Sequence, residues 1–328
     1  MSGPYKWVGL LAGWMLALAP GSLWAITITS PVMPGDVFGV NNVGNTLFQF
    51  RATGTTSTVS GMTNLGGVTT DGLGNLWFAH GDGSASAPFL IEMIPFAGTT
   101  STVKLSGATL NAPTGASGMR DLLFDSSGAL YISFYRASDA TLHLNKYLPD
   151  GAGGFLPGTY VGSFGSGFGD YGGGRLALSN NQLFATTGVW YQRLYTMRLL
   201  DGTSSKVAPD TNVAGQTQFL PGYPNLMLYS APDGVRRVSF DQGTGAIGTT
   251  STQLLTGGFN DGLVYSAAAG RLYLSNRASG GEIRFATNAQ LASAMGTPLA
   301  ISSLGLLLQS GNASINRDLA VIEAPPNY

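Results

Sequence analysis

The sequence contains no cysteine and few charged residues, and both absences narrow what the protein can be. Of its 328 residues, 10% are charged and only two are histidines, and the formal net charge is −1. Without cysteine, no disulfide bond can form and no thiolate can act as nucleophile or metal ligand. Because the Lys and Arg residues are scattered, the chain lacks the clustered basic face that phosphate backbones require. We therefore expect no nucleic-acid partner.

Long apolar runs are also absent, apart from one near the N-terminus. Lys6 precedes the apolar run 7–19, a Pro-Gly pair breaks it, and Ala25 offers a small residue for cleavage. That order of regions is typical of a secretory signal peptide. The run is shorter than the roughly 20 residues that span a bilayer, and an uncleaved anchor is the alternative. We expect residues 1–25 to be a cleaved leader and the mature protein to be secreted or periplasmic, with no stable membrane span.

Glycine and a short repeat are abundant. The chain has 48 glycines, and the pentapeptide Gly-Thr-Thr-Ser-Thr occurs at 54–58, 98–102 and 248–252, with a degenerate copy at 202–205. Each copy follows a run that alternates apolar and polar residues, which is the pattern of a half-buried strand. Repetition on this scale indicates one supersecondary unit used several times. From residue 36 onward, short strands alternate with turns rich in Gly, Asn, Asp and Ser, as in all-β folds.

The repeated turns define a four-stranded unit. In each unit two strands flank a tight turn, where Gly or Asn supplies the positive φ that the hairpin needs. The alternating run adds the third strand, and the fourth begins at or just after the Thr-rich corner. Such units start near residues 66, 120, 173, 215 and 261.

The N-terminal unit, residues 36–60, lacks a first strand, and residues 317–322 resemble one. A C-terminal strand that completes the N-terminal sheet would close a ring and remove exposed sheet edges. The sequence therefore predicts an all-β, six-bladed propeller of four-stranded antiparallel blades, forming one domain over residues 36–328. The other predicted segments are a lead-in at residues 26–35 and a short helix at Thr287–Met295, with Thr287 or Asn288 as its N-cap.

One unit carries a family resemblance. Gly67–Ala79, followed by Leu90–Gly98, resembles the repeats of the virginiamycin B lyase-like group, within the wider set of NHL-repeat and gluconolactonase-like propellers. As a fold, the resemblance covers most of the chain after the leader. It implies a six-bladed propeller and two possible activities. One is a ring-opening elimination that uses histidines, a glutamate and a metal ion, and the other is metal-dependent hydrolysis by residues of the central channel.

His80 is the candidate base. It lies just beyond Leu76–Ala79, where the family repeat often places a polar residue at the propeller mouth. An imidazole suits proton abstraction near neutral pH. The alternative is an ordinary loop histidine. His143 lies in an alternating third strand toward the outside of its blade, so we do not expect it to share a substrate with His80.

Asp and Asn residues near the starts of first strands are candidate ligands for a divalent ion. They are Asp121, Asn260, Asp261 and Asp318, with Asp170 in the equivalent connection of another unit. First strands line a propeller's channel, so these oxygens would converge, and oxygen ligands suit Ca²⁺ or Mg²⁺. The alternative is that each Asp accepts backbone N–H bonds or pairs with an adjacent Arg. Gluconolactonase-like relatives also use a glutamate from the early part of the chain as a metal ligand. No such glutamate is evident in this sequence, and Asp36 is the nearest acidic residue near the start.

Aromatic residues at the ends of second strands suggest a third kind of site. They are Phe134 and Tyr135, followed by Arg136, and the pair Trp190 and Tyr191. Exposed rings and Arg at a loop face would suit a sugar or peptide, because flat rings bury area at low entropic cost. The alternative is that these rings fill the space between blades.

Together these features predict an exported, monomeric propeller that binds a small molecule, glycan or protein through its loop face. The first alternative is a metal-dependent lyase or lactone hydrolase at the channel mouth, with Asp121, Asp261 and Asp318 as ligands and His80 as base. The second is an envelope-structural or adhesive protein, favoured by low charge and abundant Gly, Ser and Thr. Fold does not decide among them, because propellers host many unrelated functions.

Overall fold

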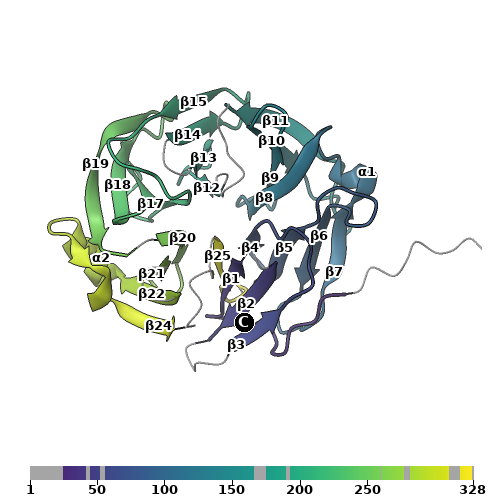
Figure 1. The fold of residues 1–328 in the computed structure, drawn as a ribbon, viewed down its shortest axis with the longest axis horizontal. Helices are drawn as coiled ribbons and strands as arrows, with labels where there is room; N and C mark the ends of the chain where they lie inside the picture. The colour runs from purple at the N-terminus through teal and green to yellow at the C-terminus, as the bar shows by residue number, and fades with distance from the viewer. Residues whose placement is uncertain are drawn as a thin grey trace, which may run out of the picture.

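The protein is a ring of six sheets around a central axis (Figure 1). The computed structural model describes residues 25–41, 45–51, 56–165, 175–189, 193–258, 260–276, 281–309 and 318–326, without the side chains of residues 56, 260, 261, 308 and 309. Each sheet contains four antiparallel strands in radial order, to which one sheet adds a parallel fifth, and the first strand of each lies nearest the axis. The predicted six-bladed β-propeller is confirmed.

The six sheets are named blades 1 to 6 in chain order. Blade 1 contains β25 (Asp318–Val321), β1 (Val37–Asn41), β2 (Thr46–Phe50) and β3 (Thr56–Val59). Blade 2 contains β4 (Val68–Thr70), β5 (Leu76–His80), β6 (Leu90–Ile94) and β7 (Thr102–Ser106). Blade 3 contains β8 (Ala116–Phe124), β9 (Leu130–Arg136), β10 (Thr141–Tyr147) and β11 (Thr159–Phe164).

The second half of the ring repeats this order. Blade 4 contains β12 (Leu176–Leu178), β13 (Phe184–Val189), β14 (Arg193–Arg198) and β15 (Ser204–Val207). Blade 5 contains β16 (Thr217–Phe219), β17 (Leu226–Ala231), β18 (Gly234–Phe240) and β19 (Ile247–Thr256). Blade 6 contains β20 (Asn260–Ser266), β21 (Arg271–Asn276), β22 (Glu282–Thr287) and β24 (Gly305–Gln309).

In blades 2 and 3, an Asp organises the turn between the first and second strands. In blade 2, Asp71 Oδ1 accepts the backbone N–H groups of Leu73 at 2.9 Å and Asn75 at 3.0 Å. Gly74 between them has φ +75°, a conformation that L-residues rarely adopt. Asp125 repeats the arrangement in blade 3. These Asp residues are turn formers.

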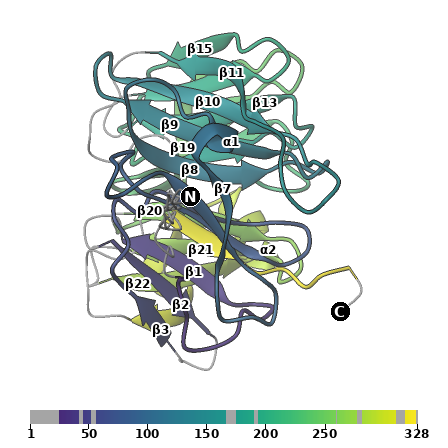
Figure 2. The same cartoon turned by 90° about the vertical axis from the view of Figure 1, so that its right-hand side faces the viewer.

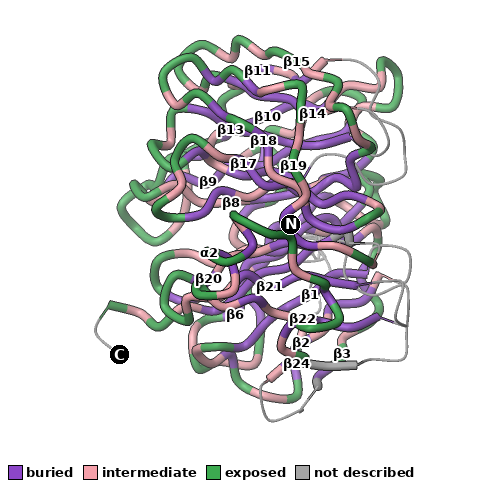
Figure 3. The backbone as a smooth tube through the Cα atoms, turned by 90° about the vertical axis from the view of Figure 1, so that its left-hand side faces the viewer, coloured by how far each residue is buried: buried purple, intermediate pink, exposed green. Residues whose placement is uncertain are grey.

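The core is divided among the interfaces between blades. Six clusters of buried apolar side chains are present, and each combines residues of two neighbouring blades. Buried residues accordingly follow the strands, while exposed residues gather in the turns (Figure 3). Trp77 fills the interface between blades 2 and 3, and its Nε1 donates to Asp71 Oδ2 at 2.8 Å.

The last strand closes the ring, as predicted. β25 pairs antiparallel with β1, with Val37 opposite Val321 and Val40 opposite Asp318. Leu319 and Val321 pack toward blade 6 and Ala320 toward blade 2, so this strand fills both neighbouring interfaces. Figure 2 shows the C-terminal segment, in yellow, beside the N-terminal blade. Strand pairing thus joins the two ends of the chain in one blade.

Blade 5 differs in two details from the predicted four-stranded unit. In blade 5 the pentapeptide 248–252 lies inside β19, because Val238 pairs with Ser251 and Phe240 with Ile247, and a bulge takes up the extra residues. β23 (Leu299–Ala300) then adds a parallel fifth strand to this blade. The remaining helical elements are α1 (Gly107–Leu110), α2 (Asn288–Ala294) and η1 (Ile301–Ser303).

The helices are short, and the predicted one is confirmed. Thr287 caps α2 through a capping box with Gln290, which satisfies backbone N–H groups at the helix start. No helix among the described residues has the length and apolar character needed to cross a membrane.

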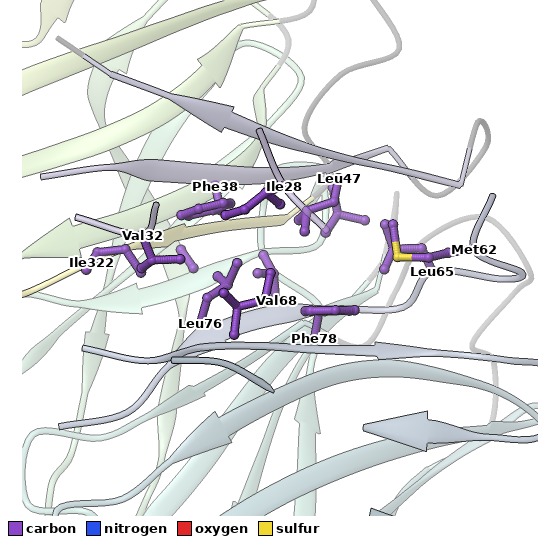
Figure 4. Close-up of a cluster of buried hydrophobic side chains, with 13 residues drawn as sticks. Ile28, Val32, Phe38, Leu47, Met62, Leu65, Val68, Leu76, Phe78 and Ile322 are labelled. Carbon is purple, nitrogen blue, oxygen red and sulfur yellow. The ribbon is translucent and has the colours of Figure 1, made fainter. Parts of the chain in front are cut away.

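The lead-in is part of the core. Ile28 and Val32 are buried between blades 1 and 2, in the cluster that contains Phe38 and Phe78 (Figure 4). The backbone N–H groups of Ile28 and Val32 each donate at 2.9 Å, to the carbonyl oxygens of Thr99 and Gly98 respectively. The lead-in is therefore paired with the β6–β7 corner of blade 2.

Candidate functional site

A buried polar network links the first strands around the axis. Asp318 Oδ2 of blade 1 accepts the N–H of Val68 in blade 2 at 2.9 Å. Asp121 of blade 3 accepts the N–H of Leu176 in blade 4, and Gln216 Oε1, just before β16, accepts that of Leu263 in blade 6 at 2.7 Å. Every second blade thus supplies a side-chain oxygen to the backbone of the next. The two aspartates, Gln216 and Arg175 are here called the axial network.

Arg175 provides the positive charge of this network. It directly precedes β12, and its side chain is 4% exposed. Its Nη1 lies 2.6 Å from the carbonyl oxygen of Gly66 and 3.2 Å from Asp318 Oδ2, and it also contacts the carbonyl oxygen of Arg120. One guanidinium from blade 4 therefore binds blades 1, 2 and 3.

Glycine makes room for the two carboxyl groups. At Gly67 a Cβ atom would lie 2.7 Å from both Cα and Oδ1 of Asp121, and 3.2 Å from Oδ2 of Asp318. A contact of 2.7 Å is shorter than real Cβ atoms make, so a side chain would displace the pair. The glycine lets the carboxyl groups of blades 1 and 3 approach each other across blade 2.

The environment favours a protonated carboxyl group in this pair. Burial raises the pKa of Asp121 well above its ordinary value, and the nearby carboxylate of Asp318 raises it further, against the opposing effect of Arg175. Burial also raises the pKa of Asp318, against the opposing effects of Arg175 and the Val68 N–H. With a proton shared between them, the two carboxyl groups and the guanidinium carry no net charge.

This electrostatic arrangement predicts an unusual pH dependence of stability. The folded pair binds a proton at a higher pH than the unfolded chain, whose aspartates titrate near 3.8. The native state then holds more protons, so the pair's contribution to the free energy of unfolding should grow as the pH falls from 7 to 5. One proton is worth up to about 1.4 kcal/mol per pH unit.

Urea unfolding of wild type and Asp121→Asn at pH 7 and pH 5 measures this effect. The variant keeps His143, whose pKa burial lowers and which therefore acts in the opposite direction. Lowering the pH from 7 to 5 should raise the free energy of unfolding of the wild type relative to that of the variant. An equal pH response in the two proteins would contradict the shared proton.

The axial network borders a small cavity. The cavity has a volume of about 170 Å³ and is lined by first-strand residues, among them Asp121, Gln216, Gln218 and Asp318. It has room for several water molecules, but it is smaller than the roughly 300 Å³ at which drug-sized ligand sites begin. Gln218 adds a polar side chain to a lining that is otherwise rich in Leu, Val and Ala.

Of the predicted metal ligands, the structure brings Asp121 and Asp318 together on the axis. Asp170 and the side chains of Asn260 and Asp261 lie outside the described residues. Within the described part of the chain, no three His, Cys, Asp or Glu side chains form a group that could hold a metal ion. The metal hypothesis remains a prediction, in which Arg175 already occupies the space beside two of the proposed ligands.

Asp36, the acidic residue nearest in sequence to the position of the family's early glutamate, is buried but does not belong to the axial network. It accepts hydrogen bonds from Arg51 Nε at 2.8 Å and Gln49 Nε2 at 2.6 Å. Gln49 Nε2 and Arg51 Nη2 also donate to the carbonyl oxygen of Pro31, and these contacts tie the lead-in to blade 1.

The predicted aromatic patch requires a correction. Phe134 is fully buried between blades 2 and 3, and Tyr135 is 5% exposed between blades 3 and 4. Successive residues of β9 point to opposite faces of the sheet, so each ring enters a different blade interface. Arg136 pairs with Asp139 across its own hairpin. Trp190 and Tyr191 lie outside the described residues.

His80 is not a simple loop residue. It ends β5, with its side chain 12% exposed, and its Nε2 lies 2.7 Å from Glu92 Oε1. Glu92 is buried in β6, and its other oxygen accepts from Ser101 Oγ. A carboxylate that fixes an imidazole is an arrangement that general bases use. His143 lies in blade 3 and is not in this cluster; its ring is tilted by 42° against that of Tyr160, with 5.5 Å between the ring centroids.

Solved structures that are similar to this protein agree with the propeller architecture. Gluconolactonase XC5397 of Xanthomonas campestris matches with a TM-score of 0.53 and 15% identity, over 77% of this chain and 84% of that one. The periplasmic gluconolactonase PpgL of Pseudomonas aeruginosa matches with a TM-score of 0.51 and 13% identity, over 85% and 81%. A functionally unknown Desulfotomaculum acetoxidans protein matches with a TM-score of 0.53 and 13% identity, over 92% and 89%.

At identities this low, the likeness establishes the fold alone. No family model and no curated protein matches the sequence. The chain therefore has the propeller fold that gluconolactonases share, and its activity must be argued from its own residues.

Proposed function

We propose that the protein is exported, loses residues 1–25, and acts as a binding or scaffold propeller without a metal ion on its axis. Its partner is a small molecule, glycan or protein at the loop face. The position of Arg175 carries the proposal, because a guanidinium already pairs with Asp318 beside Asp121. The N-terminal pattern of basic, apolar and small residues supports export. A net charge of −1 gives no strong field to select a highly charged partner.

Calorimetric titration of Ca²⁺ and Mg²⁺ into the chelator-treated protein tests this proposal. We expect no binding heat at micromolar ion concentrations, in wild type or in Asp261→Ala. Micromolar binding by wild type that Asp261→Ala abolishes would contradict the proposal and restore the channel metal site.

Lactone hydrolysis is the second candidate function, and the His80–Glu92 pair is the specific observation in its favour. Glu92 holds Nε2 of His80, which leaves Nδ1 as the nitrogen to take a proton from water. The fold shared with gluconolactonases adds support. Hydrolysis of glucono-δ-lactone in a pH-stat, above the spontaneous rate and reduced at least 100-fold by His80→Gln, would establish this activity. Equal rates with and without protein would exclude it for this substrate.

A further inference from the structure

The lead-in begins at a buried polar cluster of blade 2. The N–H of Ile26 donates to Ser101 Oγ at 2.8 Å, and the N–H of Ser101 donates back to the carbonyl oxygen of Ile26 at 2.8 Å. Ser101 Oγ in turn donates to Glu92 Oε2. Ser101 and Glu92 are each 2% exposed. The nitrogen of Ile26 is therefore connected through Ser101, by two hydrogen bonds, to a buried carboxyl group.

Glu92 has no permanently charged partner among the described residues. It forms one ion pair there, with His80, whose imidazole is charged only when protonated. Its other contact, Ser101, is neutral. A buried carboxylate is costly unless a cation and hydrogen bonds compensate it. The cluster has hydrogen bonds in place and a position for a positive charge.

We propose that the Ala25–Ile26 bond is the processing site and that the freed α-ammonium of Ile26 binds in this cluster as the counter-ion of Glu92. This inference rests on the leader removal proposed above. An endopeptidase adds one water molecule across the amide bond. The leader leaves with a carboxylate on Ala25, and the nitrogen of Ile26 takes up a proton. One N–H donor then becomes three, at an atom already within hydrogen-bond distance of Ser101.

The lead-in keeps the new terminus at this position. The side chain of Ile28 is buried beside Phe38, and its N–H donates to the carbonyl oxygen of Thr99 (Figure 4). A terminus anchored two residues away loses little freedom when its ammonium binds, so more of the interaction free energy remains. Because Glu92 also holds His80, removal of the leader would place a positive charge close to the candidate base.

Two chains that differ by one residue test the proposal. The mature chain starts at Ile26, and the control chain keeps Ala25 as its first residue. The control retains the amide N–H of Ile26 and its bond to Ser101, but moves the ammonium about 3.5 Å along the chain. The mature chain should show an unfolding equilibrium constant about tenfold lower than the control, from urea titrations. The unfolding equilibrium constant of the control chain divided by that of the mature chain is then about ten. The Glu92→Gln substitution in both chains should lower this ratio to about 1, whereas Glu323→Gln should leave it at about ten.

Equal stabilities of the two chains with Glu92 intact would overturn the proposal. If Glu92→Gln does not fold, reductive methylation of the mature wild type decides instead. Its Ile26 amine should react at least tenfold more slowly in the native state than in urea, and equal rates would also overturn the proposal. N-terminal sequencing of the exported protein distinguishes a wrong cleavage position from a wrong ammonium site. A first residue other than Ile26 contradicts removal after Ala25, whereas Ile26 with equal stabilities contradicts only the ammonium site.

Discussion

Replacement of Arg175 by methionine should lower the free energy of unfolding by about 3–5 kcal/mol at pH 7, because it removes one partner of a buried ion pair. Methionine retains much of the side-chain volume but leaves Asp318 beside Asp121 without a cation. It also leaves the carbonyl oxygens of Gly66 and Arg120 without this donor. The loss should be smaller at pH 5, because protonation relieves the repulsion between the carboxyl groups.

Urea denaturation of Arg175→Met and Arg198→Met provides the comparison. Arg198 pairs with Asp201 on the surface, where the side chain is 51% exposed, so its replacement should change stability by less than about 1 kcal/mol. Equal small losses in the two variants would show that Arg175 does not stabilise the axis. A loss in Arg175→Met that increases at pH 5 would contradict the charge balance proposed here.

Deletion of β25 should have a larger effect still. A chain that ends at residue 317 loses the antiparallel pairing with β1 and the acceptor for the Val68 N–H. It also loses four buried apolar side chains, those of Leu319, Ala320, Val321 and Ile322. Full burial of a large apolar side chain contributes about 1.5–3 kcal/mol, so the total approaches the roughly 5–15 kcal/mol stability of a whole domain. The truncated chain should lose its cooperative thermal transition.

Thermal circular dichroism of two truncations measures this effect. A chain that ends at Glu323 keeps β25 and should melt within a few degrees of the full chain. Adding a peptide of residues 318–326 to the shorter truncation should restore the transition, because an open sheet edge accepts a strand in trans. An unchanged melting temperature in the chain ending at residue 317 would contradict closure of the ring by β25.

The fold was largely predictable because its determinants are local and repeated. The Asp, Gly and Asn residues of the turns between first and second strands, such as Asp71 and Gly74, specify a hairpin without reference to the rest of the chain. The missing first strand of residues 36–60 and the extra strand at the C-terminus together indicated closure. The position of the Thr-rich corner in blade 5 was missed, because a bulge within β19 depends on its pairing with β18.

The axial network was only half predictable. Asp121 and Asp318 were found because the Arg-Asp-Leu runs 120–122 and 317–319 were expected at the starts of first strands. Arg175 stands in the same relation to Leu176, and comparison of the units could have indicated it. Its partners, however, lie 109 and 143 residues away in sequence, at Gly66 and Asp318. Contacts of that range become visible only once the ring is assembled.

Which of the other candidate residues are buried could not be predicted from the sequence. An alternating strand predicts which residues share a face, but which face meets a neighbouring blade depends on the assembled ring. Phe134 and Tyr135 were therefore assigned to the surface and lie between blades. Glu92 was missed for a related reason, since an acidic residue in the run Leu90–Ile94 usually faces solvent. Here it is buried and bound to Ser101 and His80.

Anomalous diffraction from crystals of the mature protein soaked in Mn²⁺ would show whether a divalent metal ion binds on the axis. We expect no anomalous peak on the axis, with the Arg175 guanidinium in hydrogen-bond contact with Asp318 and the carbonyl oxygen of Gly66. An anomalous peak ligated by Asp121 and Asp318, with Arg175 displaced, would contradict this expectation and identify the channel as a metal site.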